Sequence, residues 1–367
     1  MSHDTLDRPD HDGLDDAQLF LPELWAAHAR VHPGKPAVVV GEVRRSWGDF
    51  DRNMSRIANQ LIARGIGRGD KVAVLMANSV EILEIIFGIV RAGACVVPLS
   101  GLLTPDQVRT LVNDCGAVAL FCSGAYRGTV EAVRDSLDHL RADGFIAFGF
   151  EAPGWQRFED FLAGASDDFP KVSYHLDDPF NIIYSSGTTG LPKGIVQTHR
   201  ARQHWSFSNA IELRFHDRAR ALTTTALYSN GTWLMVLPVL FTGGTLHVLP
   251  DFTPRAFLET VQRERITHSF LVPTQCIVTL ADPAVEQFDL SSLEAVLCGG
   301  SALRPDTRQE VLARLTPNLV YLYGFSEGFA TMCKPHAHAD KPESVGTPVL
   351  GFELMIVDDD GRAWSGK

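Results

Sequence analysis

The chain has 367 residues, 45% of them hydrophobic and 9% aromatic, so it can bury large sheets and form two or three structural units. The formal net charge is −11, which argues against nucleic acid as a partner, because phosphate backbones are bound by basic faces. No apolar run approaches about 18 residues, so no membrane-spanning helix is expected. Residues 1–18 are acidic and polar, which predicts a disordered tail, and they lack the basic segment and apolar core of a signal peptide.

Apolar runs and helix signals alternate through the middle of the chain. Asn78, with Glu81 three residues later, predicts a helix cap, and Thr104-Pro-Asp-Gln107 predicts a capping box. The predicted elements are a strand at 71–76, a helix from 78 to about 91 that stops at Gly93, a strand at 95–99, a helix at 104–114, a strand at 117–122, a helix at 129–142, a strand at 145–148, a helix at 254–265 and a strand at 268–272. This alternation predicts βαβ units and largely parallel sheets, and by itself allows any layered α/β fold.

The six cysteines show no C-x-x-C pairing, and several fall in apolar runs. We interpret them as buried free thiols, which is consistent with a reducing cytosol and a cytoplasmic protein. A metal site in Cys333–Asp340 would need a second pair of ligands, so we expect a solvated loop there. His199 is expected at the surface or at a helix start.

Residues 184–194 read Tyr-Ser-Ser-Gly-Thr-Thr-Gly-Leu-Pro-Lys-Gly, directly after an apolar segment. Glycine allows close backbone approach to a ligand, and backbone N–H groups with hydroxyls can surround phosphate oxygens. The spacing is not that of a Walker A loop, and the Pro-Lys-Gly ending distinguishes it from a flexible linker. The pattern indicates handling of a nucleoside triphosphate. The candidate phosphate-binding residues are Ser185, Ser186, Gly187, Thr188, Thr189, Gly190 and Lys193.

This segment closely resembles the phosphate loop of the adenylate-forming superfamily, which includes acyl-CoA synthetases, peptide-synthetase adenylation domains and luciferases. Two further motifs agree: Tyr-Leu-Tyr-Gly-Phe-Ser-Glu at 321–327, and Cys-Gly-Gly-Ser-Ala-Leu at 298–303. The resemblance implies that Ser326 contacts phosphate and that Glu327 holds Mg²⁺, which prefers carboxylate and phosphate oxygens. By the same resemblance the adenine is framed by Gly299, Gly300, Ser301, Tyr323 and Gly324.

Weaker matches at 89–99, 243–246, 272–274 and 342–351 extend the resemblance over roughly residues 20–367. It implies an α/β fold of two stacked αβ subdomains with layered, largely parallel sheets, followed by the start of a small β-rich subdomain. We expect the large domain at 19–345, with an internal boundary near 195, and the β-rich start at 346–367. The family continues further, with a ribose-binding aspartate and a C-terminal domain that carries a lysine. These are not found before Lys367, so we expect the N-terminal part of such an enzyme, weakly active or inactive by itself.

Tyr228 occupies an aromatic-or-histidine position thought, in the family, to gate the acyl and thiol channels. A tyrosine has an ordinary pKa of about 10, which makes it a poor proton shuttle at neutral pH. The expected walls of the acyl pocket are Tyr228, Trp233, Leu234, Phe325 and Gly328. Segment 228–236 has no acid to pair with a substrate ammonium, which favours a non-amino carboxylic acid.

The resemblance therefore implies an ATP-dependent carboxylate–CoA ligase with ATP, Mg²⁺ and CoA. Two alternatives remain open. One is a peptide-synthetase adenylation domain or an acyl-AMP ligase that loads a carrier protein. The other is a non-catalytic module that binds a nucleotide and an acid.

Overall fold

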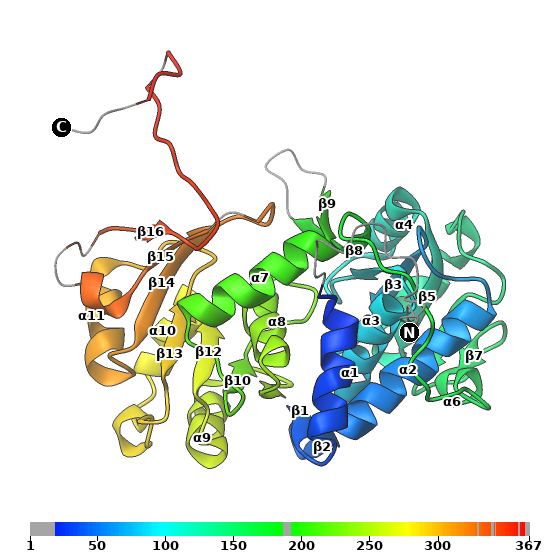
Figure 1. The fold of residues 1–367 in the computed structure, drawn as a ribbon, viewed down its shortest axis with the longest axis horizontal. Helices are drawn as coiled ribbons and strands as arrows, with labels where there is room; N and C mark the ends of the chain where they lie inside the picture. The colour runs from blue at the N-terminus through cyan, green and yellow to red at the C-terminus, as the bar shows by residue number, and fades with distance from the viewer. Residues whose placement is uncertain are drawn as a thin grey trace, which may run out of the picture.

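The computed structural model describes residues 19–185, 192–328, 330–338, 341, 343–358 and 360–363, and these build two mixed sheets flanked by helices (Figure 1). The predicted acidic tail at 1–18 lies outside the described residues. The prediction of layered, largely parallel αβ sheets is confirmed, since most neighbouring strands in both sheets run parallel.

Within the described ranges, the first sheet has seven strands. From edge to edge they are β7 (Gln156–Arg157), β6 (Phe145–Phe148), β5 (Ala117–Ser123), β3 (Lys71–Leu75), β4 (Cys95–Pro98), β8 (Pro179–Ser185) and β9 (Lys193–Thr198). Only β8 and β9 pair antiparallel, as a hairpin at one edge. The apolar β-branched composition of the central strands suits burial on both faces, which is typical of parallel sheets.

The second sheet has nine strands in the described residues. Their order is β16 (Thr347–Pro348), β15 (Ala330–Cys333), β14 (Leu319–Gly324), β13 (Ala295–Cys298), β12 (His268–Leu271), β10 (Arg220–Thr223), β11 (Thr245–Val248), β1 (Pro36–Val40) and β2 (Val43–Ser46). Antiparallel pairs lie only at the two ends of this sheet. The N-terminal β1 pairs in parallel with β11, so the start of the chain completes the sheet formed by its second half.

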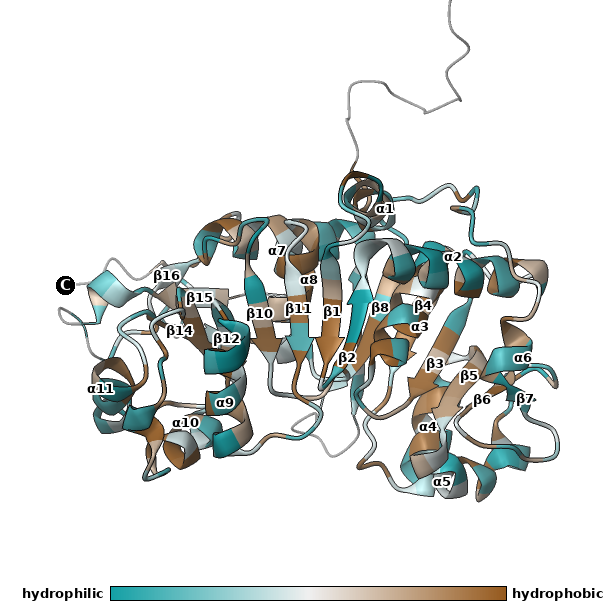
Figure 2. Ribbon diagram, turned by 90° about the horizontal axis from the view of Figure 1, so that it is seen from below, coloured by the Kyte–Doolittle hydropathy of each residue, from teal (hydrophilic) through white to brown (hydrophobic). Residues whose placement is uncertain are grey.

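Helices cover both sides of the sheets (Figure 2). One side carries α1 (Leu21–Val31), α2 (Trp47–Ala63), α3 (Val80–Arg91), α7 (His199–Glu212) and α8 (Trp233–Phe241). The other carries α4 (Pro105–Cys115), α5 (Arg127–Glu131), α9 (Pro254–Glu264), α10 (Pro273–Leu280) and α11 (Pro305–Arg314). The short α6 (Phe158–Phe161) follows β7, and 3-10 turns lie at Gly124–Tyr126, Arg134–Ser136, Asn230–Thr232, Val285–Gln287 and Pro335–Ala337.

The largest apolar core joins the two sheets. Trp233 of α8 is 1% exposed, and its ring lies 6.1 Å from the rings of both Phe87 of α3 and Phe180 of β8. Aromatic pairs at this separation contribute roughly 0.5–1.5 kcal/mol beyond the area they bury. Trp233 therefore packs the half of the molecule built on the second sheet against the half built on the first.

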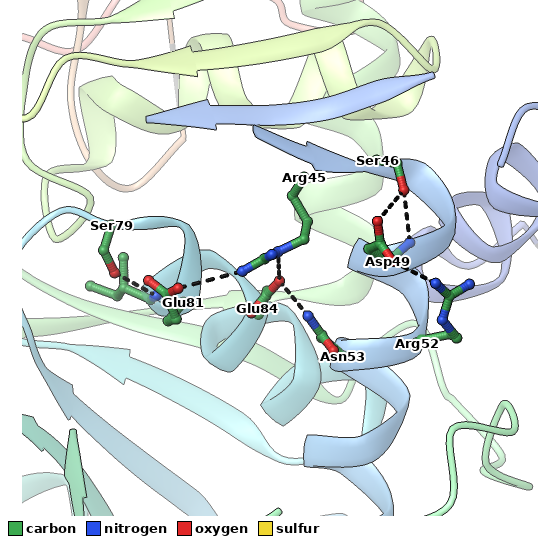
Figure 3. Close-up of polar contacts among 9 residues, drawn as sticks. Arg45, Ser46, Asp49, Arg52, Asn53, Ser79, Glu81 and Glu84 are labelled. Atoms are coloured by element: carbon green, nitrogen blue, oxygen red, sulfur yellow. Dashed lines mark hydrogen bonds and ion pairs between the residues drawn. The ribbon is translucent and has the colours of Figure 1, made fainter. Parts of the chain in front are cut away.

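A buried polar cluster reinforces the same junction (Figure 3). Glu84 interrupts the apolar face of α3, and its Oε1 accepts hydrogen bonds from Arg45 Nε of β2 at 2.7 Å and from Asn53 Nδ2 of α2 at 2.8 Å. Burial raises the pKa of Glu84, and the Asn53 and Arg45 hydrogen bonds oppose that shift. The cluster satisfies the carboxylate and links an edge strand of the second sheet to the helices of the first.

Most predicted element ends are within two residues of the observed ones, and the capping box at Thr104 is present. The cap of α3 was assigned one residue early, because Ser79 Oγ, not Asn78, accepts from the Ile82 backbone N–H. Asn78 Oδ1 instead accepts from the backbone N–H of Leu227, at 3.3 Å. Asn78, which the sequence pattern indicates as a helix cap, thus links the loop before α3 to the loop after β10.

The predicted helix at 129–142 is wrong in extent. The α-helix ends at Glu131, and only a 3-10 turn follows. Tertiary contacts compete with helix hydrogen bonds there: Asn113 Nδ2 donates to the Ser136 carbonyl at 2.9 Å, and Arg134 Nη2 donates to the Gly154 carbonyl at 2.6 Å. Local propensity is therefore overridden by contacts that are distant in the sequence.

Two further expectations need correction. The loop after β15 is not wholly solvated, because His338 is buried, with Nε2 2.8 Å from the Leu319 carbonyl oxygen and Nδ1 3.5 Å from Cys333 Sγ. His199 does begin a helix, as predicted, but it is 3% exposed and packs on Phe180. All six cysteines are buried free thiols, which confirms that prediction.

Candidate active site

A cavity of about 750 Å³ lies where the carboxyl ends of strands from both sheets meet. Its lining comes from the ends of β4, β8, β12, β13 and β14, from the loop after β10, and from α4, α7 and α8. Ligands of open α/β sheets bind at such edges, because loops there are free to vary while the strands hold them in place. The lining residues are Pro98, Leu99, Ser100, Leu102, Leu103, Gln107, Leu111, Ile183, Tyr184, Ser185, Pro192, Trp205, Tyr228, Ser229, Asn230, Gly231, Leu234, Phe270, Val272, Gly300, Leu322, Gly324, Phe325, Ser326 and Ala330.

The described lining contains no charged side chain. Aromatic rings come from Tyr184, Trp205, Tyr228, Phe270 and Phe325, and the polar groups are serines with one asparagine and one glutamine. A cavity with this composition accepts a flat or aliphatic body and offers few, fixed hydrogen-bonding groups. It offers no carboxylate to pair with a ligand ammonium.

The predicted phosphate loop joins the two strands of the β8–β9 hairpin. Ser185 ends β8, Lys193 begins β9, and the two residues are register partners. Ser186, Gly187, Thr188, Thr189 and Gly190 lie outside the described residues. Ser185 and Pro192, on either side of that gap, both line the cavity, whereas Lys193 is exposed and does not.

The turn after β13 carries the predicted adenine-framing glycines. Gly300 lines the cavity and has φ of +92°, a conformation that residues other than glycine rarely adopt. A Cβ on Gly299 would lie 3.0 Å from Leu322 Cβ and from the Leu322 carbonyl oxygen, so this glycine lets β13 approach β14 closely. Ser301 is exposed and lies outside the cavity lining.

The β14–β15 hairpin carries the second motif at its turn. Gly324, Phe325 and Ser326 line the cavity, and Tyr323, which is 52% exposed, does not. The Ser326 carbonyl oxygen accepts from Gln197 Nε2 at 2.7 Å and from Asn230 Nδ2 at 3.4 Å. These two amides fix the turn from β9 and from the segment after β10.

Glu327 is exposed beside Ser326. Among the residues that the structure describes, no group of three or more His, Cys, Asp or Glu side chains could hold a metal ion. A metal at Glu327 would therefore have at most two such side chains from the described residues and would take its other ligands from phosphate and water, which is the usual coordination of Mg²⁺ bound with a nucleotide.

Tyr228 lies between two cavities. It lines the cavity of about 750 Å³ and also a smaller one of about 160 Å³, and Pro98 and Leu99 are shared in the same way. The segment before it is held by Asn78, through the hydrogen bond to the Leu227 N–H. A side chain in this position can separate or connect the two spaces by a change of rotamer.

Three of the five residues predicted to form the walls of the acyl pocket line the cavity. Leu234 and Phe325 line the cavity, as Tyr228 does, but Trp233 and Gly328 do not. Trp233 lies in the core, where its Nε1 donates to the Leu227 carbonyl at 2.9 Å. Gly328, with φ of +119°, is buried against Trp205, whose Nε1 would be 3.5 Å from an added Cβ.

Several lining residues escaped the sequence-based prediction. Trp205 lies in a helix and Phe270 in a strand, and the pattern around each of them is that of ordinary core. Val272 falls in the Val-Pro-Thr run noted at 272–274, and Pro98 and Leu99 end the run noted at 89–99. Those two matches extend the family resemblance, but no site residue was predicted from either of them.

The fold and this cavity define a ligand-binding α/β protein with its site at the strand carboxyl ends. The family model of the AMP-binding enzyme matches residues 25–366, and the chain belongs to that family. This confirms the resemblance to the adenylate-forming superfamily.

Two curated relatives are similar over nearly all of the chain. The indoleacetate–CoA ligase of Aromatoleum aromaticum is 33% identical over 351 residues, which cover 94% of this chain and 68% of the relative. A feruloyl-CoA synthase of an Amycolatopsis species is 32% identical over 341 residues, covering 91% and 65%. The chain thus spans about two thirds of the length of these relatives.

Solved structures support the fold. The N-terminal domain of FACL13 from Mycobacterium tuberculosis, in an inhibitor-bound crystal structure, superposes with a TM-score of 0.85 at 24% identity, covering 95% of this chain and 86% of that one. The anthranilate CoA ligase AuaEII, in complex with anthranoyl-AMP, gives a TM-score of 0.85 at 23% identity and coverages of 95% and 67%. Within the described part of this chain, no helix has both the length and the apolar character needed to cross a bilayer.

Proposed function

We propose that the protein is an ATP-dependent carboxylate–CoA ligase. In the first step, a carboxylate oxygen attacks the α-phosphorus of ATP, which forms an acyl-adenylate and releases pyrophosphate. In the second step, the CoA thiol attacks the acyl carbon, which forms the thioester and releases AMP. The main support is one arrangement: an uncharged, aromatic cavity whose rim holds Ser185 and Pro192 of the phosphate-loop hairpin together with Gly300 and Ser326.

The residues would act mainly by positioning and by charge neutralisation. Ser185, Lys193 and the loop between them would hold the β- and γ-phosphates, and Ser326 would contact the α-phosphate. Gly299, Gly300, Ser301, Tyr323 and Gly324 would frame the adenine. Glu327 would hold Mg²⁺, which supplies charge neutralisation to the phosphates when bound.

For the acid we propose an aryl or arylalkyl carboxylic acid. The described lining of the cavity has five aromatic side chains and no charged one, so it suits a flat apolar body and leaves a substrate ammonium unpaired. The names of the two curated relatives, an indoleacetate–CoA ligase and a feruloyl-CoA synthase, point to the same class.

A ligase that loads a carrier protein is the second candidate. Another relative, 28% identical, is the fatty acid–[acyl-carrier-protein] ligase ScoC of Streptomyces coeruleorubidus, and the described residues do not distinguish the two thiol acceptors. The choice is tested by offering the pre-formed acyl-adenylate either CoA or a phosphopantetheinyl carrier. A cytoplasmic location, with which six buried free thiols are consistent, belongs to the same proposal.

The direct test is exchange of labelled pyrophosphate into ATP by this chain, with Mg²⁺ and a panel of aryl, arylalkyl and aliphatic acids. Any exchange by this chain should be weak and should depend on an aryl acid. Lys193→Met should lower it by about 10²–10³, as loss of one electrostatic donor does at comparable sites. Lys171→Met, at another exposed lysine, is the matched control. Because weak or absent turnover is expected of this chain by itself, the proposal would be contradicted by a folded chain that shows no exchange with any acid and also binds neither ATP nor any aryl acid.

A further inference from the structure

Arg202 of α7 is buried directly behind the acid cavity. Its side chain has no exposed surface, and its Nε donates to Asn181 Oδ1 of β8 at 2.7 Å. Its Nη2 donates to Asn230 Oδ1 at 2.8 Å, and its Nη1 has no hydrogen-bond partner in the described residues. The guanidinium is thus held by two neutral amides, and its Nη1 is left without a partner among the described residues.

The charge of Arg202 has no ion-pair partner in the described part of the chain. Among the described residues, no aspartate or glutamate forms an ion pair with Arg202, whereas the equally buried Arg91 pairs with Asp51 at 2.6 Å. The remaining partners of Arg202 are the rings of Trp205 and Trp233, whose centroids both lie 4.9 Å from the guanidinium carbon. Burial lowers the pKa of Arg202 to about 9, which still leaves it protonated at neutral pH. An unbalanced buried cation is costly, so its counter-charge should come from a ligand.

Two of its four contacts reach the cavity. Asn230 and Trp205 both line it, while Asn181 and Trp233 do not. Because Asn230 Oδ1 is turned toward Arg202, its Nδ2 faces away and donates to the Ser326 carbonyl oxygen. The positive charge therefore polarises an amide that touches both the acid cavity and the motif expected to contact phosphate.

We propose that Arg202 is a positioning residue whose fixed positive charge makes the cavity select a carboxylate over an uncharged molecule of the same shape. This inference rests on the proposed function, since it assigns the substrate carboxylate as the missing counter-charge. Asn230 transmits the field and is held in place by the cation. Trp205, stacked between the guanidinium and the cavity, carries the apolar contact with the substrate body.

The test neutralises the positive charge of Arg202 while it leaves the shape of the site nearly unchanged. Asn181→Asp and Asn230→Asp each place a carboxylate of nearly the same shape against Arg202, and only the second alters the cavity lining. Binding of indole-3-acetate and of its neutral isostere indole-3-acetamide is measured by calorimetry, with α,β-methylene-ATP and Mg²⁺ present. Binding of indole-3-acetamide depends on correct folding and on the shape of the cavity. Binding of indole-3-acetate depends in addition on the charge of the carboxylate.

The wild-type chain should prefer the acid. In Asn181→Asp the acid affinity should fall by about tenfold, the effect of one unit charge at roughly 10 Å in a medium of effective dielectric about 20. Affinity for the amide should stay within about twofold. Arg202→Met removes the charge and keeps the length of the side chain, so it should also lose the preference for the acid over the amide compound. This variant replaces Asn181→Asp in the test if the aspartate variant does not fold.

Three outcomes are decisive. Loss of the preference in Asn181→Asp, with amide binding intact, supports a field effect of Arg202. An unchanged acid-to-amide ratio in both Asn181→Asp and Arg202→Met would overturn the inference and leave the proposed function standing. If the folded wild-type chain binds neither compound nor any other aryl acid, the proposed function fails and the inference falls with it.

Discussion

Replacing Gly231 by alanine should reshape the acid cavity through one contact. Gly231 lies in the 3-10 turn Asn230–Thr232 and lines the cavity, and its φ is not positive, so the backbone tolerates alanine. The added Cβ would stand 2.9 Å from Phe270 Cε1 and 3.0 Å from Phe270 Cζ, closer than carbon atoms pack. Phe270 is 3% exposed on the central strand β12, so relief must come from its ring, which is itself part of the cavity wall.

Overpacking of this kind typically costs about 1–3 kcal/mol. The same displacement should lower affinity for an aryl acid by roughly five- to a hundredfold, since each 1.4 kcal/mol is a factor of about ten. Phe270→Leu removes the two ring atoms that clash, so the double variant should recover part of both losses, with a coupling of about 1 kcal/mol or more.

The assay is a double-mutant cycle on two readouts, urea unfolding and calorimetric binding of an aryl acid. Gly128→Ala is the matched control, because a Cβ there meets nothing within 4 Å. The reasoning is refuted if Gly231→Ala binds the acid like wild type, or if Phe270→Leu worsens it additively, because either result would mean that the ring does not transmit the strain.

Three further predictions concern the stability of the fold and the role of Tyr228 between the two cavities. Burial lowers the pKa of His199, His247 and His268 to about 4, below the unfolded value near about 6.5, so stability should fall as pH drops from about 6.5 to about 4, by roughly 2 kcal/mol per histidine between pH 7 and 5. His247→Gln should reduce the pH-dependent loss of unfolding free energy by the contribution of one histidine, measured by denaturant titrations at several pH values. If the dependence of the unfolding free energy on pH does not change, this histidine must be protonated in the folded state as readily as in the unfolded state. Glu84→Gln should change the free energy of unfolding by less than about 1 kcal/mol, because it keeps the acceptor for Arg45, whereas Glu84→Ala should cost about 3 kcal/mol; equal losses would disprove the hydrogen-bonding argument. Tyr228→Ala should join the cavities of about 750 and 160 Å³ and shift preference toward longer acids in an acid-panel assay, while Tyr228→Phe should not.

The sequence predicted the parts of the site in which backbone geometry requires particular residue types. The segment from Ser185 to Lys193, the Gly299–Gly300 turn and the turn at Ser326 carry glycines and hydroxyl residues in tight spacing, and described residues from each line the cavity. Asn230, Trp205 and Phe270 could not be found in this way, because they come from separate elements and acquire their roles only by packing.

The same limit applies to the fold. Alternating strands and helices were predicted where signals are local, as in β3, α4 and β6. The pairing of β1 with β11 joins Val38 to Leu246, and no local pattern records so distant a partner. Arg202 is the clearest case: in the sequence it is one more charge in a polar helix, and only the structure reveals that it is fully buried and that no acid among the described residues forms an ion pair with it.

The most direct test of the account is calorimetric binding of a hydrolysis-resistant acyl-adenylate analogue, an arylacetyl sulfamoyl adenosine, to this chain. It requires no turnover and occupies the acid cavity and the Gly300–Ser326 rim together. We predict one site per chain, an affinity at least about a hundredfold tighter than that of AMP or of the free acid, and a loss in Gly231→Ala. A folded chain that binds the analogue no better than AMP would contradict the claim that the cavity and its rim form a single acyl-adenylate site.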